Sequence, residues 1–254
     1  MKVTFLGTGT SVGVPRIGCD CAVCRSDDPK NKRLRCSILL QRGDYSILVD
    51  TTPDLRTQAL RHDIKRVDAV LFTHAHADHL HGLDEVRCYC FGRETPLPCH
   101  ASPATLKRIK HVFDYAFDSP YKQAVPQLSL HPIEGPFSLL GFEIEPIEVM
   151  HGRLPVLGFR LGGFAYVTDC SAIPPDSLER LRGLDTLVID GLRHKPHPTH
   201  FTVQQALDAV AELAPKHAYL THISCQLEHH ETNRALPDGV EMAYDGLELD
   251  FALI

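Results

Sequence analysis

The sequence centres on Thr73-His74-Ala75-His76-Ala77-Asp78-His79, which directly follows the apolar run 69–72. The apolar run predicts a buried strand. Because side chains two positions apart point to the same side of an extended backbone, His74 and His76 form a candidate pair of metal ligands. Asp78 and His79 come next, at the expected start of a helix, where a carboxylate is favoured and the pair can face a second ion.

The density of ligands in this stretch predicts two metal ions. Four nitrogen and oxygen ligands exceed the three protein ligands of a mononuclear catalytic zinc site. Two divalent ions roughly 3.5 to 4 Å apart lower the pKa of a shared water, supply hydroxide near neutral pH and hold both oxygens of a displacement. The expected chemistry is hydrolysis of a phosphoester or an acyl compound. A solvated, His-rich turn is the alternative, and the apolar strand before the run argues against it.

Strand-like runs lie on both sides of this stretch, first as hairpins and later mixed with helices. They are residues 3–6, 37–40, 45–49, 128–132, 142–149, 157–161, 164–168, 186–189 and 218–220. Helices are expected over residues 54–62 and 105–117, and after Thr202, where Gln205 completes a capping box. This order predicts an α/β (α+β) fold of packed sheets with helices outside.

The composition is that of an ordinary globular protein, with 254 residues, 43% hydrophobic and 23% charged. No repeat or linker marks a boundary, so we expect residues 1–254 to form one domain. A net charge of −6 argues against a nucleic-acid partner. No apolar run reaches the roughly 18 residues that cross a bilayer, and the N-terminus lacks a signal-peptide pattern. The expected location is the cytoplasm, with no membrane partner, and a homodimer is kept open beside a monomer.

The His-x-His-x-Asp-His run resembles the signature of the metallo-β-lactamase superfamily, and later positions match its ligands in order over nearly the whole chain. The resemblance implies that one ion is held by His74, His76 and His151, that the other is held by Asp78, His79 and His222, and that both share Asp169. Asp78 is counted among the catalytic residues as well as the ligands, and Asp50 as a support of the metal loop. The implied fold is a four-layer αββα sandwich with the site at one edge of the sheets.

Three cysteines crowd into residues 18–25, where Cys19, Cys21 and Cys24 form a Cys-x-Cys-x-x-Cys pattern. Nine cysteines without a signal peptide indicate metal ligands and buried thiols rather than disulfides. A tetrahedral structural zinc needs a fourth ligand, and Cys225, close after His222, is the first choice. The competing candidates are Cys36, Cys170, Cys88 and Cys90.

The cysteine loop also narrows the resemblance. Together with Gly7-Thr8-Gly9 and Thr221-His222-Ile223-Ser224, it is similar to the PhnP-type cyclic-phosphate phosphodiesterases of the carbon–phosphorus lyase pathway, which carry a structural zinc on this loop. Their usual fourth ligand is a histidine where this chain has Cys225, which implies an all-cysteine site here. PqqB, a protein of pyrroloquinoline quinone biosynthesis, shares the Cys-rich start and is the nearest alternative.

Residues 190–200 form a Pro-rich, cationic loop before the capped helix. The resemblance places His200 as a non-ligand histidine near the scissile phosphate, beside a helix N-terminus that favours anions. A protonated imidazole there donates to the leaving alkoxide or holds the phosphate. Arg193, His194 and His197 are expected to belong to a solvated loop.

These features predict a dinuclear phosphodiesterase with two Mn or Zn ions in its active site and one structural Zn. The expected substrate is a small phosphodiester such as 5-phosphoribosyl 1,2-cyclic phosphate or a 2′,3′-cyclic nucleotide. The alternatives are RNA cleavage, thioester or lactone hydrolysis on the same metals, and a non-enzymatic carrier role like that of PqqB.

Overall fold

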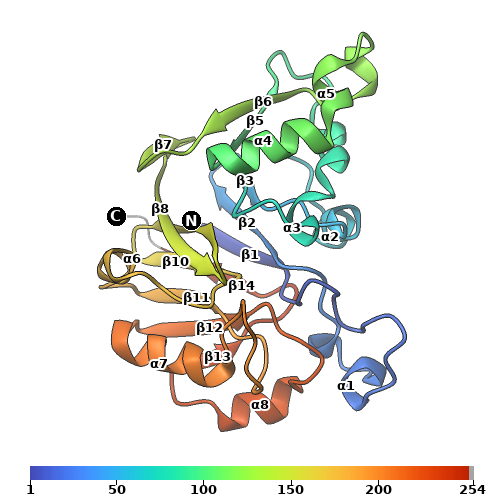
Figure 1. The fold of residues 1–254 in the computed structure, drawn as a ribbon. Coiled ribbons are helices and arrows are strands. Elements are labelled where there is room, and N and C mark those ends of the chain that lie inside the picture. The colour runs from blue at the N-terminus through green and yellow to red at the C-terminus, as the bar shows by residue number, and fades with distance from the viewer. Residues whose placement is uncertain (252–254) are drawn as a thin grey trace.

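The computed structural model describes residues 1–251, which form two seven-stranded sheets packed against each other (Figure 1). Residues 252–254, the end of the predicted domain, lie outside the described residues. The first sheet, in the order β14-β1-β2-β3-β4-β5-β6, contains β1 (Lys2–Gly7), β2 (Ser37–Arg42), β3 (Tyr45–Val49), β4 (Ala69–Leu71), β5 (Leu97–Ala101), β6 (Leu128–Pro132) and β14 (Glu248–Asp250). The second, in the order β13-β12-β11-β10-β9-β8-β7, contains β7 (Phe137–Leu139), β8 (Phe142–His151), β9 (Leu154–Leu161), β10 (Phe164–Val167), β11 (Thr186–Asp190), β12 (His217–Thr221) and β13 (Val240–Met242).

The central strands are buried on both faces, which is why their sequences are continuously apolar. In β2, Ile38 and Leu40 point into the core between the sheets, whereas Leu39 points to the outer face of the first sheet. In β10 of the second sheet, Phe164 and Tyr166 point into the same inner core, whereas Ala165 and Val167 point outward. Each sheet therefore buries both of its faces.

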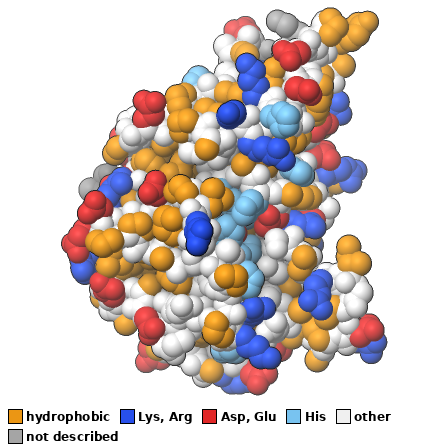
Figure 2. Space-filling model, in the orientation of Figure 1, with side chains coloured by type: hydrophobic (Ala, Val, Ile, Leu, Met, Phe, Trp, Pro, Cys, Tyr) orange, Lys and Arg blue, Asp and Glu red, His pale blue; other side chains and the backbone are white. Residues whose placement is uncertain are grey.

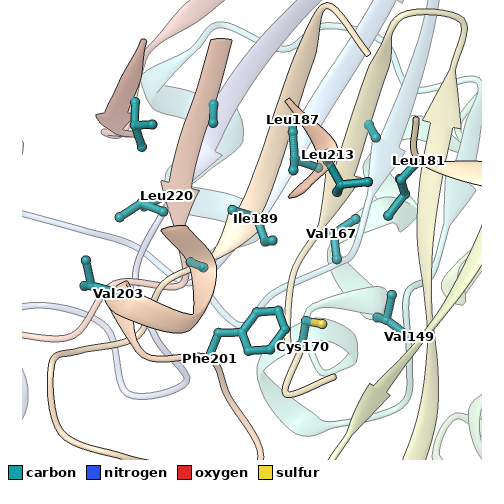
Figure 3. Packing of buried hydrophobic residues seen from close by; sticks show 14 of the residues in the cluster. Val149, Val167, Cys170, Leu181, Leu187, Ile189, Phe201, Val203, Leu213 and Leu220 are labelled. Carbon is teal, nitrogen blue, oxygen red and sulfur yellow. The ribbon is translucent and has the colours of Figure 1, made fainter. Parts of the chain in front are cut away.

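Helices cover the two outer faces. Apolar side chains of five helical segments form one buried cluster with the outer face of the first sheet. These segments are α2 (Leu55–Arg61), α3 (Ala77–Leu80), the 3-10 segment η2 (Leu83–Tyr89), α4 (Pro103–Val112) and α5 (Asp114–Asp118). The second sheet is flanked by α6 (Pro175–Arg180), α7 (Val203–Leu213) and α8 (His229–Ala235). Figure 3 shows the packing under α7, where Val203 and Leu213 lie over strand residues such as Ile189 and Leu220. The layers confirm the αββα sandwich.

The remaining short helical segments are α1 (Ala22–Arg25), η1 (Pro29–Asn31) and η3 (Lys122–Ala124). The segment that contains α1 projects from the sandwich on the side of α8 (Figure 1). No helix within residues 1–251 is both long and apolar enough to cross a membrane.

Every strand expected from the sequence is present within three residues at either end, but the helix expected over 105–117 is wrong. The chain forms two helices there, because Phe113 leaves the helical region (φ −115°, ψ 39°) and separates α4 from α5. The first helix also begins earlier than expected, since Ser102 caps it through the amide of Thr105 and Pro103 occupies its first position. The capping box of Thr202 and Gln205 is present at the start of α7.

Candidate metal centre

The candidate ligands lie on loops that follow strands and meet at one edge of the sandwich. The 73–79 stretch follows β4, His151 ends β8, Asp169 follows β10, and His222 follows β12. Asp169 and His222 have positive φ angles (54° and 58°), and so does Asp50 after β3 (65°). Such backbone conformations are uncommon for residues other than glycine and cluster at functional sites, where the surrounding structure holds them. Here the positive φ angles occur just after three strands, β3, β10 and β12, whose following side chains lie at the same site.

The structure brings the predicted ligands together in two groups, within each of which the candidate ligand atoms lie within 4.8 Å of one another. One group is His74, His76 and His151, and the other is Asp78, His79, Asp169 and His222. Figure 2 shows histidine side chains gathered in a band near the middle of one face. The groups adjoin, since the rings of His74 and His79 are 4.4 Å apart between centroids.

Asp169 lies between the histidines of the second group. Its Oδ2 is 3.1 Å from Nε2 of His79, and its Oδ1 is 3.4 Å from Nε2 of His222. Oδ2 of Asp78 is 3.3 Å from Nε2 of His79. Burial alone would raise the pKa values of Asp78 and Asp169, but the facing imidazoles hold both well below the usual range. Both carboxylates are therefore ionised and suited to a cation.

Neighbouring groups fix the histidine rings through their Nδ1 atoms. Nδ1 of His79 is 2.7 Å from Oδ2 of Asp50, which also accepts from the hydroxyl of Thr73. Nδ1 of His151 donates to the carbonyl oxygen of Thr199 at 2.7 Å. Such contacts are typical of metal-binding histidines, because they orient the ring and leave Nε2 for the metal.

The same site holds buried nitrogen atoms without hydrogen-bond partners. Among the described residues these include Nε2 of His74, Nε2 of His79 and both ring nitrogens of His222. Buried polar atoms are normally satisfied, so a group of unsatisfied nitrogens facing two carboxylates calls for a missing partner. The donor set of imidazoles and carboxylates fits divalent Zn or Mn.

His200 lies next to this centre on a carboxylate that the sequence did not single out. Its Nδ1 is 2.6 Å from Oδ2 of Asp190, the buried last residue of β11. Its ring stacks on His222 at 4.5 Å and lies 4.6 Å from that of His151. Burial raises the pKa of Asp190, and the His200 ring opposes that rise. Asp190 thus orients the ring of His200.

The cysteine cluster forms a separate group at the base of the projecting segment. The Sγ atoms of Cys19, Cys21, Cys24 and Cys225 lie within 4.8 Å of one another. Hydrogen bonds from Cys21 and Cys24 lower the pKa of Cys19 to about 7, which favours a thiolate near neutral pH. The competing cysteines lie elsewhere: Cys36 contacts Thr221, Cys170 is buried beside Asp190, Cys90 packs under the first sheet, and Cys88 is exposed.

A buried arginine, also missed from the sequence, joins the cysteine segment to the segment that carries His222. The guanidinium of Arg33 is 1% exposed and donates to the carbonyl oxygens of Ser224 (3.0 Å) and Leu227 (2.9 Å). The amide of Ile223 donates to the carbonyl of Thr8 at 2.8 Å. The short segment 222–225 therefore connects the two sites, because His222 belongs to the histidine centre and Cys225 belongs to the cysteine cluster.

The chain is similar to several known proteins. Residues 45–223 match the Beta-lactamase superfamily domain. A crystal structure described as a new diphosphatase from the PhnP family is 48% identical with a TM-score of 0.94, and the alignment covers 99% of this chain and 98% of that one. An octanoyltransferase of Porphyromonas gingivalis is 40% identical over 98% of this chain, which spans only 51% of that protein.

A coenzyme PQQ synthesis protein B of Methylorubrum populi is 28% identical, over 75% of this chain and 73% of that protein. The fold, the ligand groups and the PhnP-family neighbour support a metal-dependent hydrolase. The chain belongs to the beta-lactamase superfamily.

Proposed function

We propose that this protein is a dinuclear metal-dependent hydrolase of phosphoric diesters. The observation that carries the proposal is the pair of adjoining ligand groups, one of which contains Asp169, with the Asp190–His200 pair directly beside them. Metal ligands alone would serve many hydrolytic reactions. A histidine backed by a carboxylate adds a proton donor for a leaving oxygen.

In this proposal each ion has its own protein ligands. His74, His76 and His151 would hold one, and Asp78, His79 and His222 would hold the other, with Asp169 of the second group shared between them in this proposal. When bound, two divalent ions supply an activated water near neutral pH and offset the charge of the reacting phosphate. The four cysteine thiols hold a structural zinc, for which thiolates are the preferred ligands.

The chain's own residues then perform proton transfer and orientation. Nδ1 of His200 donates to Asp190, so the other ring nitrogen is the one available to give a proton to the leaving oxygen. Asp78 is a ligand whose carboxylate can also accept a hydrogen bond from the attacking water. Asp50 acts one step further out, because it holds the ring of His79.

Two substrate forms share this chemistry. A small phosphodiester, such as 5-phosphoribosyl 1,2-cyclic phosphate or a 2′,3′-cyclic nucleotide, fits a compact centre with one proton donor. A diphosphate is the second candidate, because the neighbour at 48% identity is described as a diphosphatase. In both, water attacks phosphorus and a phosphorus–oxygen bond breaks.

The octanoyltransferase relative raises acyl chemistry as a competing function. It is about twice as long as the matched region, so its activity does not transfer directly to this chain. Thioester hydrolysis on the same metals is nevertheless a distinct outcome that an assay can separate. A carrier role without turnover is the other, raised by the PQQ synthesis relative.

The test is a substrate panel on purified protein, supplied with Mn or Zn after chelation. The panel contains a cyclic phosphodiester, a diphosphate diester, bis(p-nitrophenyl) phosphate and an octanoyl thioester, with Asp169→Ala as the matched control. We expect turnover of phosphoric diesters that depends on metal and is lost in the control. Turnover of the thioester alone, or of no substrate by metal-loaded protein, contradicts the proposal.

A further inference from the structure

His197 lies beside His200, and the proposed function gives it no role. Its ring centroid is 5.1 Å from that of His200, and its side chain is half-buried. It stands between Pro196 and Pro198, whose fixed backbone angles limit the freedom of the loop. The His197 side chain is therefore partly shielded from solvent on a restricted loop.

The loop around His197 is held by its own side chains. The guanidinium of Arg193 donates to the carbonyl oxygens of Lys195 (3.0 Å) and Pro196 (2.9 Å). The amide of Val203 donates to the carbonyl of Arg193 at 3.0 Å and ties the loop to the start of α7. Arg193 is thus engaged with its own loop, and His197 is presented on a braced segment.

Thr199 selects the tautomer of the neutral His197 ring. Its backbone amide lies 3.4 Å from Nδ1 of His197, and its hydroxyl lies 3.2 Å from the same atom. A backbone amide can only donate, so Nδ1 is the acceptor and the proton of the neutral ring is on Nε2. The hydrogen bonds within residues 1–251 leave this Nε2–H free.

The same threonine ties His197 to the metal centre. Its carbonyl oxygen accepts from Nδ1 of His151, one of the proposed ligands, at 2.7 Å. Thr199 therefore contacts both His197 and the proposed metal ligand His151, and it links the positions of the two rings. The result is a second imidazole donor beside His200, further from the buried centre.

We propose that His197 binds the phosphoryl group of a diphosphate that is not attacked, by donating Nε2–H to one of its non-bridging oxygens. This inference rests on the proposed function and selects the diphosphate class of substrate within it. A diphosphate places a second anionic group next to the one at the metal centre, and a donor to a charged oxygen forms the stronger kind of hydrogen bond. A simple phosphodiester such as bis(p-nitrophenyl) phosphate has no second phosphoryl group for His197 to bind, so His197 discriminates between it and a diphosphate.

The experiment compares His197→Ala with His197→Gln, which keeps a neutral N–H donor, and with His194→Ala, an exposed control in the same loop. Kinetic constants are measured on a diphosphate diester and on bis(p-nitrophenyl) phosphate. Binding of methylenediphosphonate, which is not hydrolysed, is measured by calorimetry. Melting temperature and metal content show that each variant is folded and loaded.

We expect His197→Ala to raise KM for the diphosphate and Kd for methylenediphosphonate about 10- to 150-fold, the range for loss of one hydrogen bond to a charged group. Both constants should recover partly in His197→Gln and stay unchanged in His194→Ala. The constants for bis(p-nitrophenyl) phosphate should move less than about twofold in all three.

Three results overturn the inference: unchanged methylenediphosphonate binding in His197→Ala, an equal loss on both substrates, or wild-type protein that hydrolyses only single phosphodiesters and does not bind methylenediphosphonate. Failure of the proposed function has a different signature, because wild-type protein then hydrolyses no phosphoric diester at all.

Discussion

The Asp190–His200 pair gives the sharpest test of how the site acts on a leaving group. We expect His200→Ala to keep its metal content and melting temperature but to lose turnover of a diester with a poor alkoxide leaving group. Asp190→Asn preserves the size of the buried side chain and can still accept from the amide of Cys170, 2.9 Å from Oδ2 of Asp190. It removes the negative charge behind the imidazole and places an NH2 group at the position of Oδ1, which is buried and has no hydrogen-bond partner among the described residues.

The two variants should differ in size of effect. General acid catalysis contributes about 10²- to 10⁴-fold, so His200→Ala should lose that much on the alkoxide substrate. The Asp190–His200 contact of 2.6 Å is a charge-assisted hydrogen bond, which is roughly twice as strong as a neutral one. Replacing it by a neutral hydrogen bond should reduce the stabilisation of the protonated His200 ring by about 1 to 1.5 kcal/mol, which corresponds to about a tenfold lower rate.

The assay measures kcat/KM for each variant on an alkyl ester and on a p-nitrophenyl ester of the same phosphate. The p-nitrophenolate leaves without a proton, so its ester should lose much less rate in either variant. The double variant should be no slower than His200→Ala, because Asp190 acts through His200. Equal losses on both esters would refute proton donation and leave His200 as a phosphate-binding group, and no loss on either would remove it from the site.

Three further predictions follow from the metal sites and from the half-buried His100. Asp169→Ala should lose both active-site ions and activity while keeping the cysteine-bound zinc, because two cations then face each other without an anion between them; retention of two active-site ions in metal analysis contradicts this. Cys21→Ser should lose one zinc per chain and melt at a lower temperature, and full zinc content with unchanged melting argues against the cysteine site. Burial and the neighbouring His131 lower the pKa of His100 to about 4, below its unfolded value near 6.5. The unfolded chain therefore binds a proton first, and the unfolding free energy should fall as pH falls from 6.5 to 4. In His100→Phe, whose ring can stack on Phe137, this slope should flatten; an unchanged slope in denaturant titrations shows that His100 is not its source.

Much of the fold could be predicted from the sequence, because its central strands are apolar on both faces. β5 was missed, since Pro96 and Pro98 flank its start and proline is unfavourable within a sheet. β7, β13 and β14 are three residues long, too short to show a periodic pattern. The break at Phe113 depends on local backbone angles that the helical pattern of residues 105–117 does not reveal.

The site was predictable as far as its residues follow strands in order. His151, Asp169 and His222 each come at or after an apolar run, and the structure places them with the 73–79 stretch. The support of Asp190 for His200 was not predictable, because β11 ends at Asp190 as many buried strands end at a polar residue. The contact of Thr199 with His151 could not be predicted either, because it joins residues 48 positions apart through a backbone carbonyl, which every residue type has.

Hydrolysis in ¹⁸O-labelled water shows whether water attacks the phosphorus atom and whether this attack needs the metal. Metal-loaded protein is incubated with a phosphoric diester, and the products are analysed by mass spectrometry and ³¹P nuclear magnetic resonance. Because water attacks phosphorus in the proposed reaction, we expect one ¹⁸O atom in the phosphate product per turnover and no turnover after chelation. Label in the alcohol product instead of the phosphate, or turnover that survives removal of the metal, would contradict it.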